Sequence, residues 1–445
     1  MNGVVKNTDF YVNFQTRYGG SMSRRMKIRL FAYAFSVFLI TAGIAAAGWS
    51  RAYQYERYYI YTNKIAIEEL ILSINNINVS LLKEQYVNSP VLLVKISREI
   101  SGDVSRAMLS LREIQKSGIL LNGTEDFISQ AGVLADKLAI KAARQEELSG
   151  EDRETLKDLA KTANKLSTEL FALKSESEDK EVAFNGLTEQ IKISDDRKSQ
   201  GFIYNNFYSD YLPKKVPQYL NYAVQMSESE VNDKLAQALG YSPEFMGSSE
   251  DKLKTYTFKH NNTAIIATQS GGRLAYLINE REVKNAAFDK NKAIIRAKDF
   301  LRANSFENMG ESYYYISNNI MYINFAFVKN TIMVYPDIIQ VGVALDNGEI
   351  CYVDANSYLY NHAGERNYLP KISLLDAKKI IDSGITVQSN KLCVIPTADE
   401  KEALCYEFKC IGENGSEYLF YLNAVTGDEE QIFILLSSEK GTLAI

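Results

Sequence analysis

The chain has 445 residues and a formal net charge of −5, with 46% hydrophobic and 24% charged residues. These values are close to the globular average, so they exclude a disordered chain, a collagen-like repeat and a protein made mostly of membrane-spanning helices. The acidic balance argues against nucleic acid as a partner, because phosphate binding needs a clustered cationic surface. The chain has only two histidines, which argues against a zinc site built from several imidazoles.

Residues 30–49 form an uncharged apolar stretch that predicts a membrane anchor. A helix of that length spans roughly 30 Å, the thickness of a bilayer core. Because four cations lie in residues 24–29, the positive-inside rule predicts a cytoplasmic segment over residues 1–29 and the rest of the chain outside. Amphipathic rings suited to the outer headgroup region follow the stretch: Tyr53, Tyr55, Tyr58, Tyr59 and Tyr61.

Two alternatives to the anchor are a cleaved signal peptide and a buried helix of a soluble domain. Ala45, Ala46 and Ala47 fit a cleavage site with small residues. We favour the anchor because both the apolar stretch and the segment before it are long for a signal peptide. A buried helix is disfavoured because no polar stripe interrupts the stretch.

Residues 52–195 contain a single proline, Pro90, and repeat apolar residues at helical spacing. Capping patterns at Asn122 with Glu125, and at Ser149 with Asp152, predict two helix starts. We therefore predict an antiparallel bundle of about four helices. Its apolar stripes are best explained by an internal core, with a partner-binding coiled coil as the alternative. The stripes include Ile67, Leu70, Ile71, Ile74, Ile77, Leu93, Ile96, Ile100, Met108, Leu111, Phe127, Ala131, Leu134, Leu138, Leu156, Leu159, Ala163, Leu166, Leu170 and Leu173.

The apolar period is lost after the bundle, where Gly201, Pro213 and Pro217 predict a linker over residues 196–222. Such exposed segments are common sites of proteolytic nicking. Three related α+β units are then predicted, over residues 223–288, 289–372 and 373–445. Each unit opens with an amphipathic helix and continues into antiparallel strands joined by a glycine-centred turn. The turns lie at 270–273, 346–349 and 426–429, about 77–79 residues apart.

The sequence contains no recognisable catalytic motif, so we predict no catalytic, cofactor-binding or metal-binding residue. His362 is the candidate base in this region, and we interpret it as a structural hydrogen-bonding residue. Glu413, Glu417 and residues 428–430 are interpreted as solvated turn charges. A pair of carboxylates for glycoside cleavage stays open, because such residues meet only in the fold.

Four cysteines lie in the last hundred residues: Cys351, Cys393, Cys405 and Cys410. In an exported chain they allow disulfides with three connectivities, and four buried thiols are an equal alternative. Cys405 and Cys410 would face opposite sides of one straight strand, which argues against a bond between them. A cluster of tyrosines is explained by strand packing, with a protein- or glycan-binding face as the alternative. It comprises Tyr313, Tyr314, Tyr315, Tyr322, Tyr358 and Tyr360.

Several stretches resemble the YpeB family of spore germination proteins. They are SYYYISNNIMYINFAF at 312–327, the region from Tyr335 to His362, and CYEFKC with GSEYLFYLNAVTGDEE at 405–430. In the helical region, LLNGTEDFISQAG at 120–132 and SGEDRETLKDL at 149–159 are also similar. The resemblance covers residues 52 to about 435. It implies an α and α+β fold in which an anchor and a helical bundle precede about three PepSY-like units.

The resemblance also implies a function. A family member is expected to be a non-enzymatic, single-pass protein of the inner spore (forespore) membrane, with its bulk on the cortex side. Its expected partner is a cortex-lytic enzyme of the SleB type, which it binds, stabilises, localises or inhibits until germination. Peptidoglycan is a further candidate partner, and no cofactor is implied. The alternatives are a cell-wall or cortex hydrolase and a transmembrane sensor, the latter weakened by the short cytoplasmic segment.

Overall fold

A computed structural model describes residues 23–116, 121, 123–177, 217, 219–220, 223–362, 366, 368–381, 384–397, 401–438 and 441–445. The chain divides into two compact units between Ile65 and Ala66, which are described separately. Most of the predicted linker, and residues 178–195 of the predicted bundle, lie outside the described residues.

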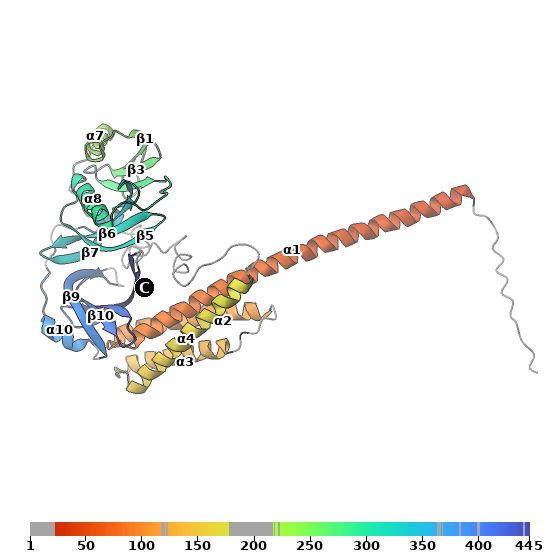
Figure 1. Ribbon diagram of the computed structural model, residues 1–445, viewed down its shortest axis with the longest axis horizontal. Coiled ribbons are helices and arrows are strands. Elements are labelled where there is room, and N and C mark those ends of the chain that lie inside the picture. Colours follow the sequence, from red (N-terminus) through yellow and green to blue (C-terminus); the bar gives the residue numbers. More distant parts are fainter. Residues whose placement is uncertain are drawn as a thin grey trace, which may run out of the picture. The chain divides into compact units, whose positions relative to one another are not determined.

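The first unit is the N-terminal part of helix α1 (Arg24–Glu84), shown in orange-red in Figure 1. By length and composition, Arg24–Tyr55 could cross a membrane, and none of this window is buried in protein. The predicted anchor at 30–49 lies inside it, and its apolar side chains, including Phe31, Phe38 and Ile44, are exposed. Such a surface is consistent with membrane anchoring, because lipid would cover it. A second window, Tyr61–Glu84, also passes the length test but is half buried.

The second unit begins with a helical bundle made by the C-terminal part of α1 with α2 (Pro90–Lys116), α3 (Thr124–Ala143) and α4 (Gly150–Ser177). Figure 1 shows α2, α3 and α4 running beside this part of α1. The predicted stripes form the core, apart from Leu173, whose side chain lies outside the description. Ile74, Ile100, Ala131 and Leu156 are fully buried, and Met108 packs against the same core. The bundle and its internal core are therefore confirmed.

Polar contacts show that α1 runs antiparallel to α2 and to α4. Glu84 at the end of α1 accepts a hydrogen bond from Ser97 early in α2, whereas Asn76 meets Asp103 farther along α2. Ser167 of α4 likewise contacts Asn75, while Lys174, one to two turns later, pairs with Glu68, earlier in α1. In each pair, later residues of one helix lie beside earlier residues of the other, as in an up-and-down bundle.

One predicted helix start is confirmed and the other is wrong. Ser149 Oγ accepts from the Asp152 backbone N–H at 3.2 Å, and the Asp152 carboxylate accepts from Ser149 N at 3.0 Å. This reciprocal pair is a capping box. Helix α3 instead has Gly123 at its N-cap, in the left-handed region at φ 79°, with no side-chain cap hydrogen bond. Asn122, the predicted cap, lies outside the described residues.

The region after the linker alternates helices with groups of four, four and five strands. Helix α7 (Glu228–Leu239) precedes β1 (Glu244–Ser249), β2 (Thr255–His260), β3 (Thr263–Thr268) and β4 (Leu274–Asn279). Helix α8 (Lys290–Ala303) precedes β5 (Met309–Ser317), β6 (Ile320–Lys329), β7 (Ile332–Ala344) and β8 (Ile350–Asp354). After the short α9 (Asn356–Asn361), α10 (Leu374–Ile380) precedes β9 (Ile385–Pro396), β10 (Glu402–Gly412), β11 (Glu417–Asn423), β12 (Glu429–Ser438) and β13 (Gly441–Ala444).

The strands do not form separate sheets. They join in the order β1-β2-β3-β4-β8-β7-β6-β5-β13-β12-β11-β10-β9, and β9 also pairs with β7 in parallel. The last pairing closes the strands from β5 to β7 and from β9 to β13 into a barrel-like ring. This β-rich region confirms the coarse fold class, whereas its division into three PepSY-like units stays a prediction.

The three glycine-centred turns lie where the sequence predicts them, between β3 and β4, between β7 and β8, and between β11 and β12. Gly271, Gly348 and Gly427 all have positive φ, between 74° and 87°. The Asn347-Gly348 turn differs in detail from a two-residue hairpin, because among these two residues only Gly348 has positive φ. The hydrogen bond that closes the turn runs from the Ala344 backbone N–H to the Glu349 carbonyl, so the loop is longer than two residues.

Each face of the sheet packs against a different core. Helices α7, α8 and α9 pack on one face of the first two strand groups, around Phe258, Phe325 and Val341. The interior of the ring holds Tyr335, Tyr421 and Phe433. The opposite faces of β10, β11 and β12 share a single core with the helical bundle.

Candidate functional site

The predicted candidate base, His362, lies in a buried cluster built on an irregularity of β7. Its Nδ1 is 2.5 Å from Asp337 Oδ2. In the β6–β7 ladder, Val334 opposes Phe327 and Ile338 opposes Ala326, so residues 335–337 bulge out of register. Pro336, which has no N–H to donate, occupies the bulge.

Arg366 completes this cluster. It contacts both oxygens of Asp337, which is fully buried, and its Nη2 also lies 2.6 Å from Glu402 Oε1. Burial alone would lower the pKa of Arg366, but hydrogen bonding and attraction to Asp337 raise it above its ordinary value. The His362 ring stacks on Tyr358 at 4.4 Å between centroids and meets the edges of Tyr219 and Phe327. Enclosed in this way, His362 connects the segment after α9 to β7, as a structural residue does. That no residue here is catalytic stays a prediction.

A second polar cluster lies inside the strand ring. Tyr335 donates a hydrogen bond to Glu407 Oε2 at 2.6 Å, and Lys391 Nζ lies 3.1 Å from Glu407 Oε1. Lys391 also lies over the Tyr335 ring, 5.4 Å from its centroid. Nearby, Gln340 donates to Asn324 Oδ1 at 2.9 Å. These contacts pair polar side chains across different strands, which favours one register.

The cysteines are four buried free thiols. Cys393 and Cys405 lie directly opposite each other on β9 and β10, while Cys410 lies on the other face of β10, within the core shared with the bundle. The structure thus agrees with the second of the two alternatives that the sequence left open, four buried thiols. Burial raises the pKa of the Cys410 thiol to about 12 and that of Cys351 to about 11, so neither is an activated nucleophile. Among the described residues no group of three or more His, Cys, Asp or Glu side chains could hold a metal ion.

The tyrosine cluster is partly or fully buried, as expected for strand packing. A row in register across the sheet brings Tyr352, Gly342, Tyr322 and Tyr315 side by side on β8, β7, β6 and β5. The Tyr322 and Tyr352 rings lie 5.6 Å apart over the glycine. They also line a groove of about 610 Å³, with polar side chains from residues 279–284 and 318–319. A binding role for this face stays an alternative.

The acidic residues at the β10–β11 and β11–β12 turns differ in exposure, and the prediction of solvated charges is wrong for Glu429 and correct for Asp428, which is exposed. Glu429 is 5% exposed rather than solvated. Its Oε2 accepts hydrogen bonds from the backbone N–H groups of Asn88 and Ser89, at 2.7 and 2.8 Å, just before α2. Glu417 is also partly buried and pairs with Lys409 at 2.8 Å, whereas Glu413 is exposed as predicted. No local signal distinguishes Glu429 from its neighbours, because its partners are more than 300 residues away in sequence.

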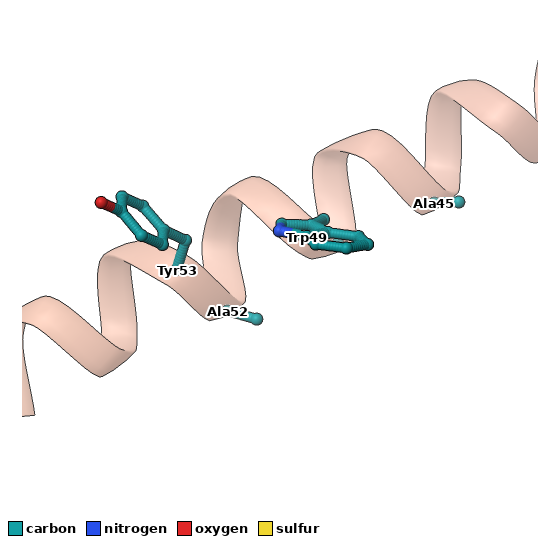
Figure 2. Close-up of a pocket in the computed structure, with 5 residues that line it drawn as sticks. Ala45, Trp49, Ala52 and Tyr53 are labelled. Atoms are coloured by element: carbon teal, nitrogen blue, oxygen red, sulfur yellow. The ribbon is translucent and has the colours of Figure 1, made fainter.

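The predicted membrane helix carries the chain's single tryptophan. Figure 2 shows the Trp49 ring beside α1 between Ala45 and Ala52, with Tyr53 projecting one turn farther along. Trp49 is 79% exposed and Tyr53 is 54% exposed. Amphipathic rings at the end of an apolar span are typical of a membrane–water boundary.

Comparison with known proteins identifies the family. Residues 51–185 match the family described as YpeB N-terminal, and residues 184–369 match "YpeB sporulation, PepSY1 and PepSY2 domains". The chain is 25% identical to the sporulation protein YpeB of Halalkalibacterium halodurans, over 82% of this chain and 88% of that protein. It is 26% identical to that of Bacillus subtilis, over 78% and 82%.

A solved structure, the Bacillus megaterium YpeB C-terminal domain, matches with a TM-score of 0.44 and 24% identity. It covers 48% of this chain and 99% of that one.

The two family matches overlap at residues 184–185 and extend over both the helical region and the greater part of the β-rich region. The chain therefore belongs to the YpeB family of sporulation proteins.

Proposed function

We propose that this protein is a non-enzymatic membrane tether that binds a cortex-lytic peptidoglycan hydrolase of the SleB type and holds it until germination. The observation that carries the proposal is family membership over both the helical and the β-rich regions. The curated relatives are named as sporulation proteins and not as enzymes. The exposed apolar helix supports tethering, with residues 1–29 in the cytoplasm and the rest on the cortex side of the inner spore membrane.

A sheet edge that is unpaired among the described residues supports a binding role for the β-rich region. Strand β9, at one end of the strand order, also pairs with β7, whereas β1 ends the order at the other side. Phe245 and Met246 of β1 are 41% and 57% exposed. An extended segment of a partner can pair with such an edge through main-chain hydrogen bonds and seat side chains on these apolar groups. We propose β1 as the contact for the hydrolase.

The test is capture of the purified hydrolase by the full chain in detergent micelles. We expect wild-type protein to retain the hydrolase and the double variant Phe245→Glu, Met246→Lys to lose at least tenfold in affinity. Val91→Lys, at a 78% exposed apolar position on α2, is the matched control and should bind normally. Equal binding by all three proteins would contradict the β1 contact. Failure of the wild-type protein to capture the hydrolase would contradict the proposed hydrolase binding.

The same preparation tests the enzyme alternative. Incubation of the full chain alone with cortex fragments should release no soluble muropeptides. Release of soluble muropeptides without any added hydrolase would contradict the proposed binding function and indicate that the protein is an enzyme.

A further inference from the structure

The helical bundle and the last group of strands share one hydrophobic core. Side chains of β10, β11 and β12 that point away from the ring interior are buried in the same cluster as Leu81, Ile100 and Leu156 of the bundle. They are Tyr406, Phe408, Cys410, Tyr418, Phe420, Leu422, Ile432 and Ile434, none more than 6% exposed. The apolar face of the bundle is thus covered by the end of its own chain, which answers what the sequence left open.

Glu429 adds a specific polar contact to this interface. A helix N-terminus carries unsatisfied backbone N–H groups and a partial positive charge. The Glu429 carboxylate lies at this end of α2, where it accepts from the backbone N–H groups of Asn88 and Ser89, the two residues before the helix, and its Oε1 accepts from Asn88 Nδ2 at 3.3 Å. Because the carboxylate is supplied by β12, the two residues before α2 are held by a residue of another region.

Further contacts surround Glu429. Asn88 Nδ2 also donates to the carbonyl of Ile380, at the end of α10, at 3.1 Å. The rings of Tyr86 and Tyr418 meet edge to face at 5.1 Å. Arg153 of α4 donates to Asn88 Oδ1 at 3.0 Å, which holds the connection between α1 and α2 against the rest of the bundle. The interface therefore combines a continuous apolar core with directional hydrogen bonds.

None of these contacts uses the chain between Ser177 and Pro217. We propose that they hold the β-rich region on the bundle when that connection is cut, so that cleavage of the linker does not by itself release the region from the membrane helix. Helix α1 is continuous from Arg24 to Glu84, so the bundle stays covalently joined to the apolar segment. Release of a bound hydrolase then requires loss of the bundle–sheet contact or of the hydrolase contact itself. The inference uses only the tethering part of the proposed function.

The experiment uses the full chain with a protease recognition sequence inserted between residues 185 and 200, reconstituted in lipid vesicles. After complete cleavage, we expect the C-terminal fragment to sediment with the vesicles and, after detergent extraction, to co-elute with the N-terminal fragment in gel filtration. Recovery of the C-terminal fragment in the supernatant, or separate elution, would overturn the inference.

A variant pair tests the role of Glu429. After cleavage, Glu429→Ala should speed dissociation of the fragments by about tenfold, because two backbone N–H groups lose their acceptor. Glu430→Ala is the matched control, because its carboxylate accepts from Asn423 of the same sheet. Equal dissociation rates for the two variants would show that Glu429 does not stabilise the interface. These results do not depend on hydrolase capture, so failure of the proposed partner and failure of this inference are distinguishable.

Discussion

Ser97 donates a hydrogen bond from its hydroxyl to the carboxyl group of Glu84, with 2.8 Å between Oγ and Oε1. Both residues are buried where α1 ends and α2 begins, and Glu84 is fully inaccessible to solvent. Burial raises the pKa of Glu84 to about 8, while the Ser97 hydrogen bond lowers it and nearby Glu99 raises it further. Glu84 is therefore mainly protonated at neutral pH.

This pKa predicts a stability that declines with pH. In the folded state the proton is held more tightly than at the ordinary glutamate value of 4.5, so the stabilisation is complete below that value and is lost as pH rises to about 8. Glu84→Gln places a neutral amide in the same space. We expect the variant to match wild type at pH 5 and to be more stable at pH 8, by about 3–5 kcal/mol. Thermal melts at both pH values measure this. Glu154→Gln, at an exposed position of α4, should change neither melt, and an unchanged pH profile in Glu84→Gln would contradict the assignment.

Gly342 is required by the tyrosine row. A Cβ at this position would lie 2.7 Å from Tyr352 Cβ and 3.2 Å from the Tyr322 ring. Gly342→Ala should therefore displace both rings and reduce the free energy of unfolding by about 1–3 kcal/mol. Chemical denaturation measures the change. Gly102→Ala is the contrasting control, because its Cβ would meet only an arginine tip at 3.9 Å within α2. Alanine should stabilise that helix by about 0.5–1 kcal/mol. A neutral Gly342→Ala would show that the rings have room to move.

Asp337 holds its buried neighbours in place by charge. Asp337→Asn leaves the Arg366 guanidinium, whose side chain is 7% exposed, with the Glu402 carboxylate as its remaining anionic partner. Loss of one member of a buried ion pair is expected to reduce stability by about 3–5 kcal/mol. His362→Gln removes a ring whose side chain is 12% exposed and should have a smaller effect. Thermal melts of the two variants compare them, and a larger loss for His362→Gln would reverse the assigned roles.

Trp49 provides a direct measurement of membrane insertion. Because it is the single tryptophan of the chain, intrinsic tryptophan fluorescence arises from this position alone. In vesicles containing lipids brominated near the headgroup, we expect strong quenching and a blue-shifted emission maximum. Lipids brominated at the chain ends should quench less. Emission unchanged by either lipid would show that this end of the apolar helix does not enter a bilayer.

The sequence was sufficient for features that depend on local spacing. The apolar period of Ile67, Leu70 and Ile74 predicted a helix and its buried face, and the Ser149–Asp152 spacing predicted the start of α4, because caps and stripes involve residues within one or two turns. The glycine turns were found for the same reason. The uncharged stretch at 30–49 needs no partner to be recognised, since its length and composition are the signal.

Only the tertiary structure decided what covers the bundle, how the strands join and what the charges at the β11–β12 turn do. Strand order depends on pairings such as β7 with β9 and β5 with β13, which no period in the sequence encodes. From local sequence Glu429 is predicted to be a solvated turn residue, because the N–H groups from which it accepts hydrogen bonds precede α2, far away along the chain. A local pattern determines which face of an element is apolar. The surface that meets this face depends on contacts between distant segments, and these exist only in the folded chain.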